Sequence, residues 1–171
     1  MRLSCLILLV VVDGLGLSCN KDSSSISGGA YPAWHPNSRS LLGVIGTSPT
    51  SAWTRFVRHW LEESVPDDTL SAVRGNDNRH PRYSPDSSRI AFSSQSVGNY
   101  NPDIWNMNAD NSNIRQLTTE GTDEYFDWSP DGKYIVYTSY RAGDWTYANG
   151  TLWIVDVETG ERRQLTFNGY P

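Results

Sequence analysis

The chain has 171 residues, a length that suits one ordinary domain. Its 14 Lys and Arg against 19 Asp and Glu give a formal net charge of −5, and its densest basic spot is only Arg162-Arg163, beside Glu161. Because binding to a phosphate backbone needs a clustered basic face, this balance argues against a nucleic-acid partner. Seven Trp and nine Tyr are a heavy aromatic content for the length, and they favour half-buried β-strands.

Residues 1–18 are predicted to be a secretory signal rather than part of the fold. Arg2 supplies a short positive region, and residues 6–12 (LILLVVV) form an unbroken apolar run. That run is too short for a membrane-spanning helix, which needs roughly 20 apolar residues. The segment 15–19 (LGLSC) resembles a bacterial lipoprotein signal, in which Cys19 is lipidated and becomes the mature N-terminus. Ordinary cleavage near residues 16–18 without a lipid is the alternative.

Residues 19–29 (CNKDSSSISGG) are predicted to be a flexible tether, because Ser and Gly dominate them. The second cysteine, Cys5, lies in the signal, so at most one Cys remains after processing and no intrachain disulfide is expected. No Cys-x-x-Cys or Cys/His spacing suits zinc, and we predict neither a metal nor a cofactor. A lipid on Cys19 would anchor the protein to a membrane of the bacterial cell envelope, in the periplasm or at the outer membrane.

Three stretches of the chain repeat one pattern: an aromatic residue, Ser or His, Pro, Asp or Asn, and then an apolar run. They are residues 31–45, 81–94 and 125–139, and their shared prolines, at 36, 85 and 130, lie 49 and 45 residues apart. A second motif, a Trp strand followed by Arg-Gln-Leu-Thr, recurs with a shift of 48 residues at 103–118 and 151–166. A period of about 45 residues with four short strands is typical of a β-propeller blade.

The last repeat shows the predicted strands most clearly. Four strands are expected there, at residues 126–129, 134–138, 152–157 and 162–167, separated by turns at 130–132 (PDG) and 158–160 (ETG). In the first repeat, residues 53–63 (WTRFVRHWLEE) fit two interpretations. They are either a strand of a degraded blade or an amphipathic helix with its apolar residues at helical spacing.

The aromatic-Ser-Pro-Asp-Gly turn, the apolar strand, the Trp strand and Gln-Leu-Thr closely resemble the propeller repeat of TolB and its relatives. The resemblance covers about residues 30–171, and not the α/β domain that precedes the propeller in TolB. It implies an all-β fold, a partial β-propeller of about three four-stranded antiparallel blades at about 30–77, 78–122 and 123–171. The first repeat departs from the pattern, since His35 replaces Ser and Asn37 replaces Asp.

Three blades are fewer than the roughly four to eight that close a propeller. The sequence therefore predicts one of three arrangements. The chain is a truncated member of its family, or two copies associate as a homodimer that completes a ring, or the blades form an open stack with an unpaired face.

The chemistry-bearing residues favour binding over catalysis. Asp86 and Asp131 recur at the blade period, and we interpret them as turn formers rather than cation ligands. Residues 106–110 resemble the opening of a calcium loop but lack its Gly, so strand and turn are predicted. There is no Gly-x-Ser-x-Gly elbow and no phosphate loop, so no catalytic residue is predicted. The three histidines are scattered, at His35, His59 and His80.

Two loops between the second and third strands carry the candidate binding residues, which are Tyr100, Arg141, Trp145 and Tyr147. Aromatic residues and Arg are enriched in binding hot spots, and loops on a rigid scaffold commonly carry function. Packing between blades is the alternative role for these side chains. With the resemblance to TolB, they predict a non-enzymatic protein- or peptide-binding or scaffold module of the bacterial cell envelope. The alternative is a fragment of the propeller domain of a prolyl-oligopeptidase-type serine peptidase.

Overall fold

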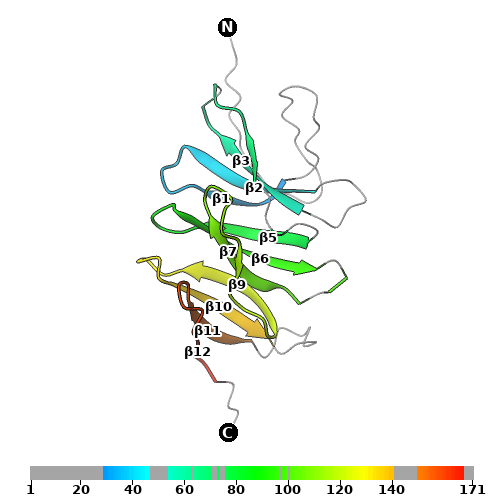
Figure 1. Cartoon of the computed structure of the whole chain (residues 1–171), viewed down its shortest axis with the longest axis vertical. Coiled ribbons are helices and arrows are strands. Elements are labelled where there is room, and N and C mark those ends of the chain that lie inside the picture. The colour runs from blue at the N-terminus through cyan, green and yellow to red at the C-terminus, as the bar shows by residue number, and fades with distance from the viewer. Residues whose placement is uncertain are drawn as a thin grey trace.

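The computed structural model describes residues 29–46, 54–62, 64–70, 73, 76–96, 98–99, 101–140 and 150–167. These residues form twelve β-strands in three four-stranded antiparallel sheets, and they include no helix. Accordingly, no helix in this part of the chain could cross a membrane. The sheets stack one on the next in chain order (Figure 1). The predicted all-β fold of about three four-stranded blades is confirmed.

Each sheet is one blade whose strands pair in chain order. The first blade contains β1 (Gly29–Trp34), β2 (Ser40–Gly46), β3 (Thr54–Trp60) and β4 (Asp68–Leu70). The second blade contains β5 (Asn76–Tyr83), β6 (Arg89–Ser96), β7 (Asp103–Asn108) and β8 (Arg115–Gln116). The third blade contains β9 (Thr122–Trp128), β10 (Tyr134–Tyr140), β11 (Thr151–Asp156) and β12 (Arg162–Gln164). The predicted strand and turn at residues 106–110 is thus confirmed.

Strand β3 decides between the two interpretations of residues 53–63. It pairs with β2 over its whole length, from Ser40 opposite Trp60 to Gly46 opposite Thr54, and with β4 on its other side. These ladders satisfy the backbone groups that a helix would satisfy internally. Leu61, which the helical interpretation placed on the apolar face, is 47% exposed. The strand prediction is confirmed and the helical alternative is wrong.

The Ser-Pro-Asp turn joins the first two strands of a blade through its own side chains. The Ser84 hydroxyl donates to Asp86 Oδ1 at 2.6 Å and accepts the Arg89 N–H at 3.0 Å. In the third blade the Ser129 hydroxyl donates to Asp131 Oδ1 at the same distance, 2.6 Å. Both carboxylates also accept a backbone N–H within the turn. The interpretation of Asp86 and Asp131 as turn formers is therefore confirmed.

The Gln-Leu-Thr motif closes the outer edge of a blade. The Thr118 hydroxyl oxygen accepts the Ile104 N–H at 2.9 Å, and the Thr166 hydroxyl oxygen accepts the Leu152 N–H at 2.8 Å. In both blades the backbone N–H of the preceding Leu donates to the carbonyl of the same third-strand residue. The motif repeats because this hydroxyl holds the end of the short fourth strand against the third.

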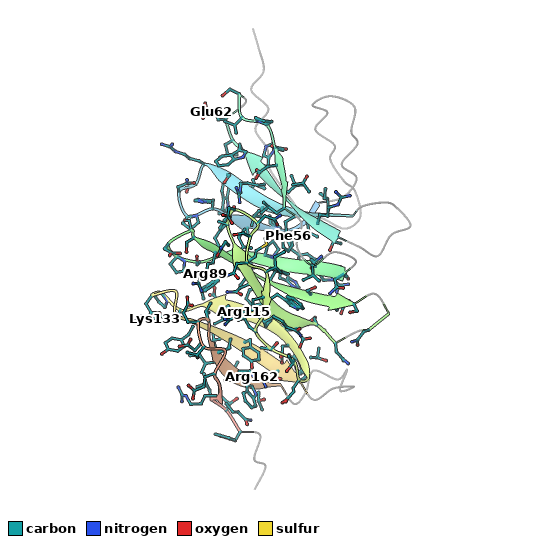
Figure 2. All side chains as sticks on the ribbon, in the orientation of Figure 1. Phe56, Glu62, Arg89, Arg115, Lys133 and Arg162 are labelled. Carbon is teal, nitrogen blue, oxygen red and sulfur yellow. The ribbon has the colours of Figure 1, made fainter. Side chains whose placement is uncertain are left out.

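Adjacent blades pack face to face through apolar side chains at equivalent strand positions. Facing the following blade are Leu42, Phe56 and Leu70 of the first blade and Ala91, Ile104 and Leu117 of the second, all at most 6% exposed. Facing the preceding blade are Tyr83, Ile90, Phe92 and Met107 of the second and Trp128, Ile135, Tyr137 and Val155 of the third, all at most 8% exposed. They form two cores, one at each boundary. Phe56, which is labelled in Figure 2, meets Phe92 edge to face at 5.2 Å between ring centroids.

Arginine side chains connect the blades beside these cores. Arg115 on β8 donates to the backbone carbonyls of Val157, at 2.6 Å, and Glu158, at 2.9 Å. Arg89 on β6 forms an ion pair with the Glu158 carboxylate (Figure 2). At the other boundary, Arg58 donates to the Ala109 carbonyl, which is equivalent to that of Val157. In each case a blade holds the turn between the third and fourth strands of the next blade.

We expect Ile104→Ala to lower the free energy of unfolding by about 2–5 kcal/mol, because it opens a cavity at a boundary where Ile104 is 0% exposed. Ile114→Ala is the matched control, since the same side chain is 38% exposed there and should cost less than about 1 kcal/mol. Urea unfolding followed by circular dichroism measures both values. Equal losses for the two variants would show that the face-to-face cores do not carry the stability.

Candidate functional site

The site residues predicted from the sequence lie outside the described residues. They are Cys19, Tyr100, Arg141, Trp145 and Tyr147. Residues 1–28, which hold the predicted signal and most of the tether, also lie outside them. The anchor and the two candidate binding loops therefore stay predictions.

The structure shows another candidate surface, on the first strand of each blade. Strands β1, β5 and β9 each lie at one edge of their sheet, and each has a register irregularity in its pairing with the second strand. Within each irregularity one residue has a positive φ: Tyr31 at 54°, His80 at 51° and Tyr125 at 49°. Residues other than Gly rarely adopt this region. We call Tyr31, His80 and Tyr125 the inner-strand row.

The first strands of the first two blades converge, which brings Tyr31 and His80 together. Strand β1 contacts β5, and the rings of Tyr31 and His80 lie 4.0 Å apart between centroids at a 60° tilt. Propeller blades surround a central channel, so the converging edges face the channel side. Tyr31 is 37% exposed and Tyr125 is 63% exposed, so both side chains present surface to solvent.

Charged groups of both signs lie beside the row. Arg79 forms an ion pair with the Asp77 carboxylate. Burial raises the pKa of Glu124, and the Arg79 guanidinium acts in the opposite direction. Burial, then the charges of Arg82 and Arg79, lowers the pKa of His80. The His80 imidazole is therefore neutral at pH 7, and it contributes an aromatic ring rather than a charge.

Among the described residues, none of the three histidines lies against an accessible serine. His80 Nδ1 lies 3.4 Å from the Ser93 hydroxyl, but Ser93 is only 2% exposed, so a substrate has no access to it. His59 Nδ1 pairs with the Asp67 carboxylate at 2.8 Å in the first blade, apart from any such serine contact in the described structure. His35 lies in the first-blade turn, where its Nδ1 accepts the Asn37 N–H. Among the residues that the structure describes, no group of three His, Cys, Asp or Glu is placed to hold a metal ion.

A groove of about 290 Å³ lies between the Ser-Pro-Asp turns of the second and third blades. Its charged lining includes Asp86, Arg89, Asp131, Lys133 and Glu158. These groups already have partners, since both aspartates bind turn N–H groups and Arg89 is ion-paired with Glu158. The groove is thus a by-product of turn and boundary structure, and the inner-strand row is the stronger candidate site.

Two acidic residues, the half-buried Asp103 and the buried Asp123, lie where the second and third blades meet. Burial, and then the neighbouring Asp123 carboxylate, raises the pKa of Asp103 to about 6. Burial also raises the pKa of Asp123, whose side chain is 0% exposed. Gln116 Nε2 donates to Asp103 Oδ2 at 2.9 Å. Perturbed pKa values often mark functional sites, but here the burial of the two carboxyls and the charge of Asp123 beside Asp103 explain the shifts.

The boundary between the first and second blades shows which side-chain chemistry suits the position of Asp123. Its repeat equivalent is Asn78, whose side-chain amide donates to the carbonyls of Thr54 at 2.9 Å, Val73 at 3.1 Å and Asn76 at 3.0 Å. An ionised Asp has no hydrogen to donate, whereas a protonated one does. The position therefore favours the neutral acid, in agreement with the raised pKa of Asp123.

Three antiparallel four-stranded blades packed face to face define the chain as part of a β-propeller. The family model of the TolB beta propeller domain matches residues 60–171, which is more than half of the chain. The chain belongs to this family. No curated protein sequence shows significant similarity to it.

Solved structures show the same fold. TolB from Acinetobacter baumannii aligns with a TM-score of 0.63 and 24% identity over 83% of this chain and 33% of its own. A structure described as TolB from Agrobacterium tumefaciens aligns with a TM-score of 0.65 and 22% identity, over 80% of this chain and 48% of its own. Pyrococcus horikoshii acylaminoacyl peptidase aligns with a TM-score of 0.59 and 16% identity, over 80% of this chain and 24% of its own. The chain spans less than half of each of these proteins.

We expect Asp123→Asn to raise the free energy of unfolding at pH 7 by about 1–3 kcal/mol, because it supplies a donor and removes a buried charge. This gain in the free energy of unfolding should shrink toward pH 4. Folding raises the pKa of both Asp103 and Asp123, so the stability that their protonated forms contribute is full below the unfolded pKa of about 4. It is lost as the pH rises through the folded pKa of each group, which is about 6 for Asp103. Urea unfolding at pH 4, 5, 6 and 7 measures the difference.

The pKa values of His35 and His80 are lowered, so the folded chain loses stability as the pH falls and these histidines become protonated. Because the variant and the unchanged chain share both histidines, this trend cancels when the two are compared. Asp127→Asn, the same substitution at an exposed position of the same strand, is the control and should change the free energy of unfolding by less than about 1 kcal/mol. An Asp123→Asn variant that is less stable at pH 7 than the unchanged chain would contradict the assignment of a buried charge.

Proposed function

We propose that this chain is a non-enzymatic module of the bacterial cell envelope that binds a protein or peptide through the channel side of its propeller blades. The inner-strand row carries this proposal. It consists of one strained residue from each blade, at equivalent positions, with aromatic rings exposed at Tyr31 and Tyr125. Backbone strain that recurs at a surface is typical of sites that position side chains for recognition.

The chemistry of the row suits a peptide. Aromatic residues and Arg are enriched in binding hot spots, and Arg79 lies beside His80 on β5. Strands β1, β5 and β9 each leave one edge unpaired within their sheets, which makes backbone groups available to an extended segment. The predicted loops with Tyr100, Arg141, Trp145 and Tyr147 would add contacts at the connections between second and third strands.

The location follows from the predicted signal. A lipid on Cys19 would hold the propeller at the periplasmic or outer-membrane surface, with residues 20–29 as the tether. The similarity to TolB structures supports an envelope role, and the partner would then be a protein or peptide of the envelope. The resemblance to TolB also suggests a peptidoglycan-associated lipoprotein as one such partner.

A second candidate function is the propeller part of a prolyl-oligopeptidase-type serine peptidase. The similarity to the acylaminoacyl peptidase of Pyrococcus horikoshii favours it. Sequencing the gene beyond the codon for Pro171 separates the two candidates. Further repeats followed by a stop codon would support the binding module, and a Gly-x-Ser-x-Gly region would support the peptidase.

We expect Tyr125→Ala to weaken peptide binding by tenfold or more, because it removes the most exposed ring of the row. The probe is a set of peptides selected on the immobilised chain from a displayed random library, with affinities from fluorescence anisotropy. Tyr134→Ala is the matched control, since Tyr134 is 38% exposed and begins a second strand outside the row. Equal affinities for the two variants, or no selectable peptide, would contradict the assignment of the inner-strand row as the peptide-binding site.

We expect Cys19→Ser to abolish incorporation of labelled palmitate when the chain is expressed in a Gram-negative host. Cys5→Ser is the matched control and should incorporate label like the unchanged chain, because Cys5 lies inside the predicted signal. Labelled protein is detected by fluorography after membrane extraction. Absence of label from the unchanged chain would favour ordinary signal cleavage instead.

A further inference from the structure

The boundary between the second and third blades buries a carboxyl group that lacks a hydrogen-bond partner among the described residues. Asp123 lies near the start of β9 and is 0% exposed, and neither oxygen of its carboxyl group has a partner there. Its backbone N–H donates to the Pro102 carbonyl of the second blade at 2.8 Å, so this residue takes part in the contact between blades. An ionised carboxyl group in such a place is a buried charge without compensation, whereas the neutral acid carries no charge.

Water has no room beside this carboxyl group on the side of Gly121, which lies two residues before it. A Cβ atom placed on Gly121 would lie 2.6 Å from the Tyr140 carbonyl oxygen and 3.0 Å from the Ser139 hydroxyl oxygen. The same point lies 3.6 Å from Asp123 Oδ1. Even a methyl group therefore does not fit, and hydration of an ionised Asp123 requires the start of β9 to move.

The charged groups around Asp123 come from several elements. Asp103 at the start of β7 faces it, and the two carboxyl groups repel each other when both are ionised. Glu120, in the connection before β9, adds a negative charge, and Arg162 on β12, labelled in Figure 2, adds a positive one. Arg162 is paired with Glu120, at 3.7 Å between nitrogen and oxygen. Tyr137 on β10 stays neutral, because burial raises its pKa to about 12.

Burial outweighs the groups that favour ionisation of the two acids. It raises the pKa of Asp123 even though the nearby hydroxyls of Ser139 and Thr118 act to lower it. Burial, and then the Asp123 charge, raises the pKa of Asp103 to about 6. Both acids therefore prefer the neutral form while the boundary is closed, and they ionise more readily once water reaches them.

The boundary between the first and second blades has other side chains at the two equivalent positions. They are Arg55, which is exposed, and Asn78, which is buried. The Asn78 amide does not titrate, and it donates to three backbone carbonyls. Its backbone N–H also donates across the boundary, to the Thr54 hydroxyl oxygen. The two boundaries are thus alike in structure and differ in the titratable chemistry of these positions.

We infer that the boundary between the second and third blades is a pH-sensitive joint, which opens locally as Asp103 and Asp123 ionise, while the first boundary does not. Opening releases the Asp123 N–H from the Pro102 carbonyl and admits water to both carboxyl groups. Tyr125 lies two residues further along β9, so the movement displaces one member of the inner-strand row. That consequence for the row rests on the proposed function, whereas the joint itself does not.

Hydrogen exchange of single backbone amides, followed by NMR, tests the joint in the full chain with Cys5 and Cys19 replaced by Ser to exclude lipidation and disulfides. Protection factors, corrected for the intrinsic exchange rate, report the equilibrium between closed and open forms. The protection factor of the Asp123 amide should fall at least tenfold between pH 4.5 and pH 7.5, because a pKa rise from 3.8 to about 6 at Asp103 allows roughly a hundredfold change. The Asn78 amide should keep its protection factor or gain, because the lowered pKa of His80 favours the folded strand as the pH rises.

Substitution separates the two acids from the other titrating groups. In the double variant Asp103→Asn with Asp123→Asn, the protection factor of the amide at position 123 should no longer fall with pH. Asp127→Asn, at an exposed position of the same strand, is the matched control and should leave the fall unchanged. Circular dichroism checks that each variant keeps its β-structure, and the comparison of the Asp123 and Asn78 amides in the unchanged chain needs no variant.

Equal falls at the Asp123 and Asn78 amides would mean that pH acts on the stability of the whole chain, and they would overturn the joint. A constant protection factor at Asp123, or a fall that persists in the double variant, would overturn it as well. The experiment contains no peptide, so its result does not depend on whether the inner-strand row binds one.

Discussion

The structure depends on sheets that are apolar on both faces. An antiparallel sheet commonly has one buried face and one face in water. Here the second blade buries Ile90 and Phe92 against the first blade, and Ala91 and Ile104 against the third. Burial of apolar surface contributes roughly 25 cal/mol per Å², so such a sheet is stabilised by each neighbour that covers one of its faces. Stacking is thus a property of each repeat, and it explains why the end faces retain Trp34 and Leu152 on the surface.

The turn chemistry that recurs in the second and third blades leaves the blade faces free to stack. The Ser84 hydroxyl and Asp86 carboxylate hold the connection between the first and second strands by bonds within the turn. Thr118 holds the fourth strand against the third in the same local way. Because these contacts lie within one blade, the faces remain free for apolar packing. The cross-blade contacts are made instead by long side chains such as Arg115, which reach the next blade beside the core.

The sequence predicted what depends on local patterns, and it missed what depends on the boundaries between blades. The repeat, the Ser-Pro-Asp turns and the three sheets follow from spacing and turn residues. Neither Tyr nor His signals a positive φ, so the row of Tyr31, His80 and Tyr125 was not predicted. The available signal was their shared place, five residues before the repeat Pro in each blade. A charged residue is expected at the surface, so the buried Asp123 was not predicted either, although its alignment with Asn78 offered a hint.

The two blade boundaries control different parts of the inner-strand row. The first boundary fixes Tyr31 against His80, and the nearby Asn78 carries no charge that could loosen it. The second boundary fixes the position of Tyr125, which lies two residues after Asp123 on β9. Ionisation of Asp123 opposes the packing of that strand, because the raised pKa means that the folded state prefers the neutral acid. One half of the candidate binding surface is thus independent of the protonation of this acid, and the other half is coupled to it.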